Sequence, residues 1–161
     1  MHRLVPFDPV RIAELVEVWY DGWHEAHAAI VPPDLVRLRT RDSFRDRALQ
    51  NAGGTRLAIG DDRLLGFVMV KGDELYQLYV APEARGQGVA QSLIGEAERR
   101  IRAAEHSRAW LACSLGNDLA ARVNRNAGWR NVGTRTVDLD TSAGSFPLTV
   151  WRFEKDLTAE G

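Results

Sequence analysis

The chain has 161 residues, which suits one domain over residues 1–161 that buries a core without disulfides or metals. Hydrophobic residues make up 45% and charged residues 27%, an ordinary balance for a soluble globular protein that excludes a disordered chain. The 21 basic and 22 acidic residues nearly cancel, so no overall field attracts nucleic acid or an anionic membrane, and any anion site must be local.

The sequence offers no secretion or membrane signal. Cys113 is the only cysteine, which excludes an internal disulfide and fits a reducing cytoplasm. Residues 1–8 lack the apolar stretch of a signal peptide, and no run approaches the roughly 20 apolar residues that span a bilayer. We therefore expect a cytoplasmic protein with no membrane or nucleic-acid partner. We expect Cys113 to be a buried apolar residue rather than a nucleophile, because its neighbours are mostly apolar.

The first part of the chain predicts one short strand and then helices. Residues 3–7 resemble a strand, and apolar residues recur at near-helical spacing from Ile12 to Trp23. A second helical pattern follows Pro32-Pro33, breaks near Thr40 and ends before Gly53-Gly54. We expect the first of these helices to pack on one face.

Three strand-like runs come next, over residues 55–60, 64–70 and 74–80. They are rich in β-branched, aromatic and other apolar residues. Short polar turns at 61–63 and 71–73 join them, which predicts three consecutive antiparallel strands.

The rest of the chain predicts two more helices and three strands. We expect a helix over 88–106, a strand over 109–115, a helix capped by Asn117 or Asp118 and ended by Gly128, and strands over 129–138 and 148–155. The helix before 109–115 predicts a parallel crossover to that strand. The last two strands could pair within the chain or between the subunits of a homodimer.

The segment from Arg85 to Ala90, RGQGVA, lies between a predicted strand and a predicted helix. Gly86 and Gly88 let the backbone approach a ligand, and a helix start offers unpaired N–H groups, so the segment predicts a phosphate cradle. A tight turn that needs small residues for packing is the alternative. A nucleotide site is disfavoured, because the lysine and Ser/Thr of a Walker loop and the G-x-G-x-x-G spacing are both missing.

These motifs resemble those of the GCN5-related N-acetyltransferase superfamily. Arg85, Gly88 and Ala90 match its acetyl-CoA signature, R/Q-x-x-G-x-G/A, and Asn117 with Gly128-Trp129 echoes its later N-x-x-A-x-x-F-Y-x-x-x-G-F segment. The resemblance covers nearly the whole chain. It implies an α/β (α+β) fold with a mixed, mostly antiparallel sheet of about seven strands, flanked by about four helices and splayed between the fourth and fifth strands.

The resemblance also implies acetyl-CoA as co-substrate and no metal. In relatives the diphosphate lies at the glycine-rich turn, and the pantetheine arm runs along the fourth strand. The cofactor-binding residues implied here are Leu78, Tyr79, Val80, Arg85, Gly86, Gln87, Gly88, Val89, Ala90, Asn117 and Asn124.

The activity implied is direct transfer of an acetyl group to a primary amine of a small molecule or peptide. Glu74 stands where several relatives have a general base, and its strand parity with Tyr76, Leu78 and Val80 predicts that all four face one cleft. A solvated strand-end carboxylate is the alternative for Glu74.

Asn124 departs from the family pattern, because relatives usually have a tyrosine there as general acid. Asparagine donates hydrogen bonds but cannot deliver a proton, so the thiolate would take its proton from water or from Tyr76 or Tyr79. The catalytic residues expected are thus Glu74, Tyr76 and Asn124. A non-catalytic acyl-CoA-binding or sensor module of the same fold is the alternative function.

The acceptor site of relatives is built mainly from the first helices. Trp23, His24 and His27 are therefore the acceptor-binding residues expected here, since aromatic side chains with polar tips suit an amphipathic amine. A helix stripe that belongs to the core is the alternative. His24 and His27 are three residues apart, but no further ligand accompanies them, so we expect no metal site.

Overall fold

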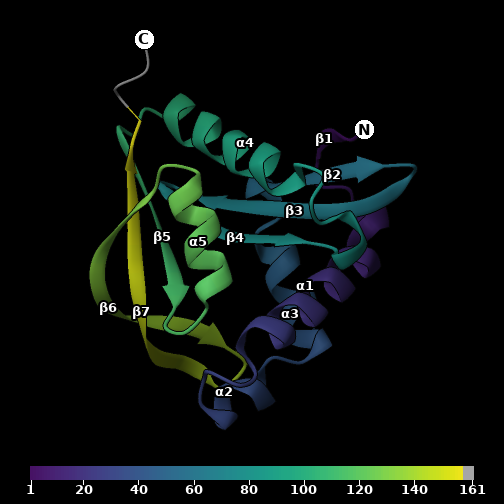
Figure 1. Cartoon of the computed structure of the whole chain (residues 1–161). Helices are drawn as coiled ribbons and strands as arrows, with labels where there is room; N and C mark the ends of the chain where they lie inside the picture. The colour runs from purple at the N-terminus through teal and green to yellow at the C-terminus, as the bar shows by residue number, and fades with distance from the viewer. Residues whose placement is uncertain (158–161) are drawn as a thin grey trace.

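The computed structural model describes residues 1–157 and centres on a seven-stranded sheet in the order β1-β2-β3-β4-β5-β7-β6 (Figure 1). Its strands are β1 (Arg3–Pro6), β2 (Thr55–Gly60), β3 (Arg63–Lys71), β4 (Glu74–Val80), β5 (Arg108–Ser114), β6 (Arg130–Thr141) and β7 (Gly144–Asp156). Its α-helices are α1 (Ile12–His27), α2 (Pro33–Leu38), α3 (Arg41–Gln50), α4 (Val89–Ala103) and α5 (Asp118–Asn126). The mixed, mostly antiparallel sheet that the sequence predicts is confirmed, with β4 and β5 as the parallel pair.

Helices cover both faces of the sheet, and each face has its own apolar cluster. On the α4 face, Leu93 and Ile101 pack against Val68. On the opposite face, α1 and α3 contribute Trp19 and Phe44 to a cluster that includes strand residues. Each fully buried side chain of this size stabilises the fold by about 1.5–3 kcal/mol, so the two clusters fix the helices on the sheet.

The helix boundaries follow local capping chemistry. The break predicted near Thr40 is the start of α3, where the Thr40 side chain accepts a hydrogen bond from the Ser43 N–H at 3.1 Å. Asn117 caps α5 by accepting from the Ala120 N–H at 3.3 Å. Gly128, at φ +92°, follows the end of α5 in the left-handed conformation that favours glycine.

The hairpin of β6 and β7 is longer than the sequence predicts. The expected strand ends at residues 138 and 148 are wrong, because strand pairing continues as far as Thr141 and Gly144. Apolar residues near the turn, Leu139, Phe146 and Leu148, pack against the α1 and α3 cluster and so keep the hairpin in contact with the body. β7 pairs with β5 of the same chain along the whole length of β5.

β4 and β5 are neighbours but diverge almost at once. Their ladder contains the single pair Glu74 and Trp110, and the Trp110 N–H donates to the Asp73 carbonyl at 3.1 Å. The sheet therefore opens between its fourth and fifth strands, as predicted. This opening places the main chain of β4 beside a space between the two halves of the molecule.

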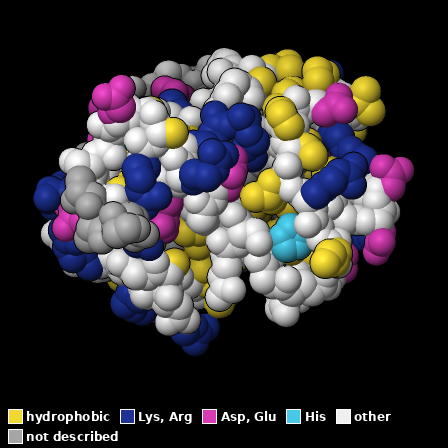
Figure 2. Space-filling model, turned by 90° about the horizontal axis from the view of Figure 1, so that it is seen from above, with side chains coloured by type: hydrophobic (Ala, Val, Ile, Leu, Met, Phe, Trp, Pro, Cys, Tyr) yellow, Lys and Arg dark blue, Asp and Glu magenta, His cyan; other side chains and the backbone are white. Residues whose placement is uncertain are grey.

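Charges of both signs are interspersed on the face seen from above α4 (Figure 2). This face is thus not dominated by one sign of charge. Among the described residues, no helix is both long and apolar enough to cross a membrane.

Candidate functional site

A cavity of about 1170 Å³ lies where β4 and β5 separate. Its walls come from the two strands, the C-terminal part of α1, the start of α4, α5 and the β6–β7 hairpin. Most of the expected site residues line this one cavity: Trp23, His27, Glu74, Tyr76, Leu78, Tyr79, Val80, Arg85, Gly86, Gly88, Val89, Ala90, Asn117 and Asn124. Segments far apart in the sequence are thus brought together at one site.

Two expected residues do not line the cavity. Gln87 donates its side-chain amide to the Glu83 carbonyl at 3.2 Å on the exposed side of the turn. His24 lies on a different side of α1, about 100° away from Trp23 around the helix, and its Nε2 is 2.8 Å from the Arg39 carbonyl. The structure therefore does not bring His24 to the cavity. Nor does any group of three or more potential metal ligands occur in residues 1–157.

β4 contains a β-bulge at Tyr76, which corrects the expected strand parity. Met69 of β3 pairs with Gln77, whereas Val70 pairs with Leu75, so Tyr76 is the extra residue. The bulge turns Tyr76 toward the α1 and α3 cluster together with Tyr79, while Leu78 and Val80 pack toward α4. The expectation that Tyr76 shares a face with Leu78 and Val80 is wrong for this reason.

The main chain at the start of α4 is open toward the cavity. Gly86 and Gly88 have φ of +78° and +80°, and a Cβ at either position would have no atom within 4 Å. The N–H groups of Val89 and Ala90 lie in the first turn of α4, where no intrahelical acceptor is available. An anionic group is thus favoured in this turn by free donors and by the helix dipole.

Arg85, next to this turn, is paired with α1. Its Nη2 lies 2.6 Å from Glu25 Oε1, and this hydrogen bond and charge lower the pKa of Glu25. Both side chains line the cavity. Sequence reasoning missed Glu25, because the two residues are 60 positions apart and a single glutamate on a helix gives no signal.

Glu74 lies at the start of β4, next to the point where the sheet opens. Burial raises the pKa of its carboxyl to about 7, and the nearby charge of Lys71 opposes this shift. No described residue hydrogen bonds to the carboxyl. Glu74 can therefore exchange a proton near neutral pH, as a general base must.

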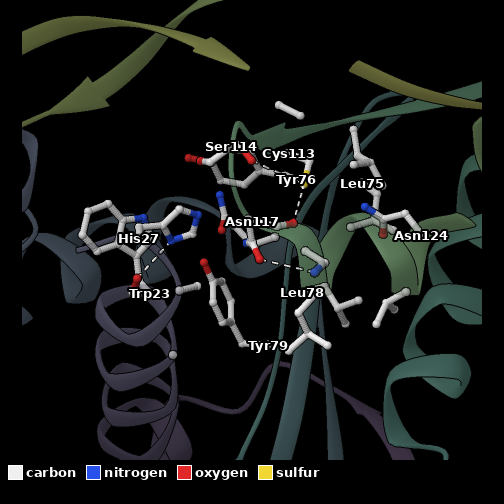
Figure 3. A pocket seen from close by; sticks show the side chains of 18 of the residues that line it. Trp23, His27, Leu75, Tyr76, Leu78, Tyr79, Cys113, Ser114, Asn117 and Asn124 are labelled. Atoms are coloured by element: carbon white, nitrogen blue, oxygen red, sulfur yellow. Dashed lines mark hydrogen bonds between the residues drawn. The ribbon is translucent and has the colours of Figure 1, made fainter. Parts of the chain in front are cut away.

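Asn117 and Asn124 lie on the α5 side of the cavity, across from Trp23 and His27 (Figure 3). The side-chain oxygen Oδ1 of Asn117 is used in the helix cap, which leaves its side-chain NH₂ group free to donate. Asn124 is buried, and its side chain lines the cavity. Both amides can thus donate to a ligand in the cavity.

Tyr76 and Tyr79 present two phenols to the cavity. The Tyr76 hydroxyl accepts a hydrogen bond from Arg47 Nη2 at 3.0 Å. Burial raises the pKa of Tyr79 well above its ordinary value, so this phenol stays protonated at neutral pH. Burial likewise raises the pKa of Cys113 to about 11, which agrees with the inert, buried cysteine that the sequence predicts.

Trp23 and His27 form the α1 wall of the cavity. Their rings stack with centroids 4.9 Å apart, and His27 Nδ1 donates to the Trp23 carbonyl at 3.0 Å. Burial lowers the pKa of His27, so its imidazole is neutral at pH 7 with an unprotonated Nε2. Trp23 belongs to the wall and to the core at once, since it is also part of the α1 and α3 cluster.

Two buried arginines, Arg39 and Arg47, also line the cavity. Sequence reasoning missed both. An arginine in a polar segment predicts a solvated side chain, and only the three-dimensional packing shows that these two are buried.

Comparison with known proteins identifies the fold and the family. A family model described as the acetyltransferase (GNAT) family matches residues 14–129. A GCN5-related N-acetyltransferase from Rhodopseudomonas palustris is similar in structure, with a TM-score of 0.75, 21% identity, and coverage of 96% of this chain and 94% of that one.

Two further similar structures contain a cofactor. PaiA N-acetyltransferase from Thermoplasma acidophilum, solved in complex with coenzyme A, has a TM-score of 0.68 and 18% identity over 97% of this chain and 99% of that one. YncA from Salmonella typhimurium, solved with its cofactor acetyl-CoA, has a TM-score of 0.67 and 13% identity over 100% of this chain and 96% of that one. At these identities the structures establish the fold, and the family model establishes membership: the chain belongs to the acetyltransferase (GNAT) family.

Proposed function

We propose that this protein transfers an acetyl group from acetyl-CoA to a primary amine. The observation that supports this most is the free main chain of the Gly86 to Ala90 turn directly beside the opening between β4 and β5. The turn suits a diphosphate, and the open edge of β4 suits an extended arm that adds to the sheet. The CoA-bound and acetyl-CoA-bound neighbours have the same fold.

The residues of the chain that would hold acetyl-CoA fall into two groups. The N–H groups of the turn and the Arg85 guanidinium would bind the diphosphate, and the main chain of Leu78 and Val80 would bind the pantetheine arm. When bound, acetyl-CoA supplies a thioester carbonyl that a neutral amine can attack. A C–N bond then forms, the C–S bond breaks, and CoA leaves as a thiolate.

Glu74 is the proposed general base. Its carboxylate would take the proton that the amine loses, directly or through a water molecule, and its pKa of about 7 suits this role at neutral pH. The thiolate must gain a proton, which water can supply. Burial makes the Tyr79 phenol a weaker acid than an ordinary tyrosine, with a raised pKa. Asn124 would donate a hydrogen bond to the sulfur without transferring a proton.

A non-catalytic acyl-CoA-binding module is the second candidate function, and Asn124 in place of an acid favours it. Incubating the purified protein with acetyl-CoA and a broad panel of amines, followed by mass spectrometry, tests the two against each other. Acetylated product supports the enzyme. Tight CoA binding without product from any amine supports the binding module.

A further inference from the structure

Arg39 and Arg47 are buried in the cavity wall next to α1 and α3. Arg39 follows α2 and is 2% exposed, and Arg47 lies within α3 and is 7% exposed. Arginine is almost never buried so deeply unless an anion pairs with it. Among the described residues, neither guanidinium forms an ion pair with a carboxylate.

The two arginine side chains have more buried N–H donors than the described residues offer acceptors. Arg39 Nη1 donates to the Asp140 carbonyl at 2.7 Å, and Arg47 Nη2 donates to the Tyr76 hydroxyl at 3.0 Å. Arg39 Nε, Arg47 Nε and Arg47 Nη1 are buried without an acceptor in the described chain. Buried donors of this kind need an explanation, and a ligand that accepts from them is one.

Neighbouring groups compensate for the two charges only in part. The Arg47 guanidinium carbon lies 4.5 Å from the centre of the Trp19 ring, an attractive cation–π contact. A ring face, however, supplies no lone pair that could accept a hydrogen bond from Arg47 Nε or Nη1. Burial, followed by the nearby charge of Arg47, lowers the pKa of Arg39 to about 10, so Arg39 still carries its charge at neutral pH.

We propose that Arg39 and Arg47 bind a carboxylate of the acceptor, so that the substrate is an amino acid or another small amine bearing a carboxylate. This rests on the proposed acetyl transfer. A planar guanidinium matches the two oxygens of a carboxylate. The cavity wall includes the apolar residues Trp23, Leu35, Leu139 and Leu148, and the Asp140 charge acts on Arg39. Taking a singly charged group into such a wall costs less than taking in a doubly charged phosphate.

The first arm of the test measures kcat/KM on matched acceptors. The panel contains the common amino acids, the amine left when each loses its carboxyl group, and the aminophosphonate analogue of each. We expect the best amino acid to be acetylated about 100-fold more efficiently than its decarboxylated counterpart, as two charged hydrogen-bonding contacts predict. Equal or better use of the decarboxylated amines or of the phosphonates would overturn the proposal.

The second arm uses Arg39→Met and Arg47→Met, with the lysine variants to retain charge. Each methionine variant should lose about 10- to 100-fold in kcat/KM on the amino acid and little on the decarboxylated amine. Arg45→Met is the control, because Arg45 is exposed on the same helix and does not line the cavity. Unchanged discrimination in both variants would argue against a carboxylate site.

The third arm does not depend on turnover. Because the charges are unpaired, the methionine variants without ligand should melt at the same temperature as the parent protein or higher. Millimolar N-acetylated amino acids should raise the melting temperature of the parent protein but not of the variants.

If CoA binds but no amine is acetylated, the proposed function fails, and this third arm alone decides the carboxylate site. If N-acetylated amino acids raise the melting temperature of the parent protein but not of either methionine variant, the carboxylate site is supported. If none of these carboxylates raises the melting temperature of the parent protein, the carboxylate site is refuted.

Discussion

The Arg85 guanidinium lies 2.6 Å from the Glu25 carboxylate and so joins the turn before α4 to helix α1 across the cavity. The two side chains are 46% and 59% exposed, and such exposed pairs contribute only about 0–1 kcal/mol to folding. In the proposed complex, the same guanidinium contacts the diphosphate. Glu25 therefore competes with the cofactor for Arg85.

Replacing Glu25 with glutamine should tighten CoA binding by about 2- to 5-fold, because it frees the Arg85 charge at a cost of less than about 1 kcal/mol in stability. Titration calorimetry with CoA and thermal unfolding measure the two effects. Glu17→Gln is a matched control, since Glu17 pairs with Arg41 at similar exposure and does not line the cavity. Weaker CoA binding by the Glu25 variant would mean that the pair positions Arg85 instead of competing for it.

Gly88→Leu should reduce CoA affinity by at least about 10-fold. A side chain at Gly88 would project into the open space beside the turn, where the diphosphate is proposed to lie. The backbone at φ +80° adds a strain of about 1–2 kcal/mol for any L side chain.

Gly72→Leu separates the two effects, because Gly72 also has a positive φ and open space around it but lies in the β3–β4 turn outside the cavity. Both variants should lose similar stability, and only the Gly88 variant should lose CoA binding. Equal affinity of the Gly88 and Gly72 variants for CoA would show that the turn is not part of the cofactor site.

The fold was predictable from the sequence because its local signals agree. Apolar periodicity, capping residues such as Asn117 and short polar turns each favour the element that forms. The β-bulge at Tyr76 was not predictable, because a single extra residue in β4 leaves no mark on an apolar run. Its effect is large, since it reverses which face each later side chain of β4 occupies.

The candidate site was predictable where a motif or the family resemblance marks its residues. The Gly86 and Gly88 turn has a sequence motif, and the structure places it at the cavity. Arg39, Arg47 and Glu25 have none, because their roles depend on contacts between distant segments, such as Arg39 with the Asp140 carbonyl. His24 was wrongly predicted to line the site, because a residue next to Trp23 in the sequence lies on a different face of the helix.

Glu74→Gln should lower kcat/KM by about 10²- to 10⁴-fold above pH 8. A base works in its ionised form, and the pKa of Glu74 is about 7. Both proteins need the same neutral amine, so the ratio of parent to variant activity should rise with pH through about 7 and then level off. The loss should shrink below pH 6, where Glu74 of the parent protein is already protonated.

The pH profile of kcat/KM from pH 5.5 to 9 measures this difference. Glu83→Gln serves as control, because Glu83 pairs with Arg63 on the surface outside the cavity. A parent-to-variant activity ratio that stays constant through about pH 7 would exclude Glu74 as the base.

Asn124→Leu tests whether the amide acts on the departing sulfur. Leucine has a similar size but no hydrogen-bond donor, so the buried position should still pack. If the amide stabilises the thiolate as it forms, kcat should fall by about 10-fold or more while the KM for acetyl-CoA changes little, since the contact strengthens only in the transition state. Because asparagine does not titrate, this loss should be the same from pH 6 to 9. A rise in KM with unchanged kcat would instead assign Asn124 to ground-state binding of the cofactor, and no change in either would leave it as a packing residue of α5.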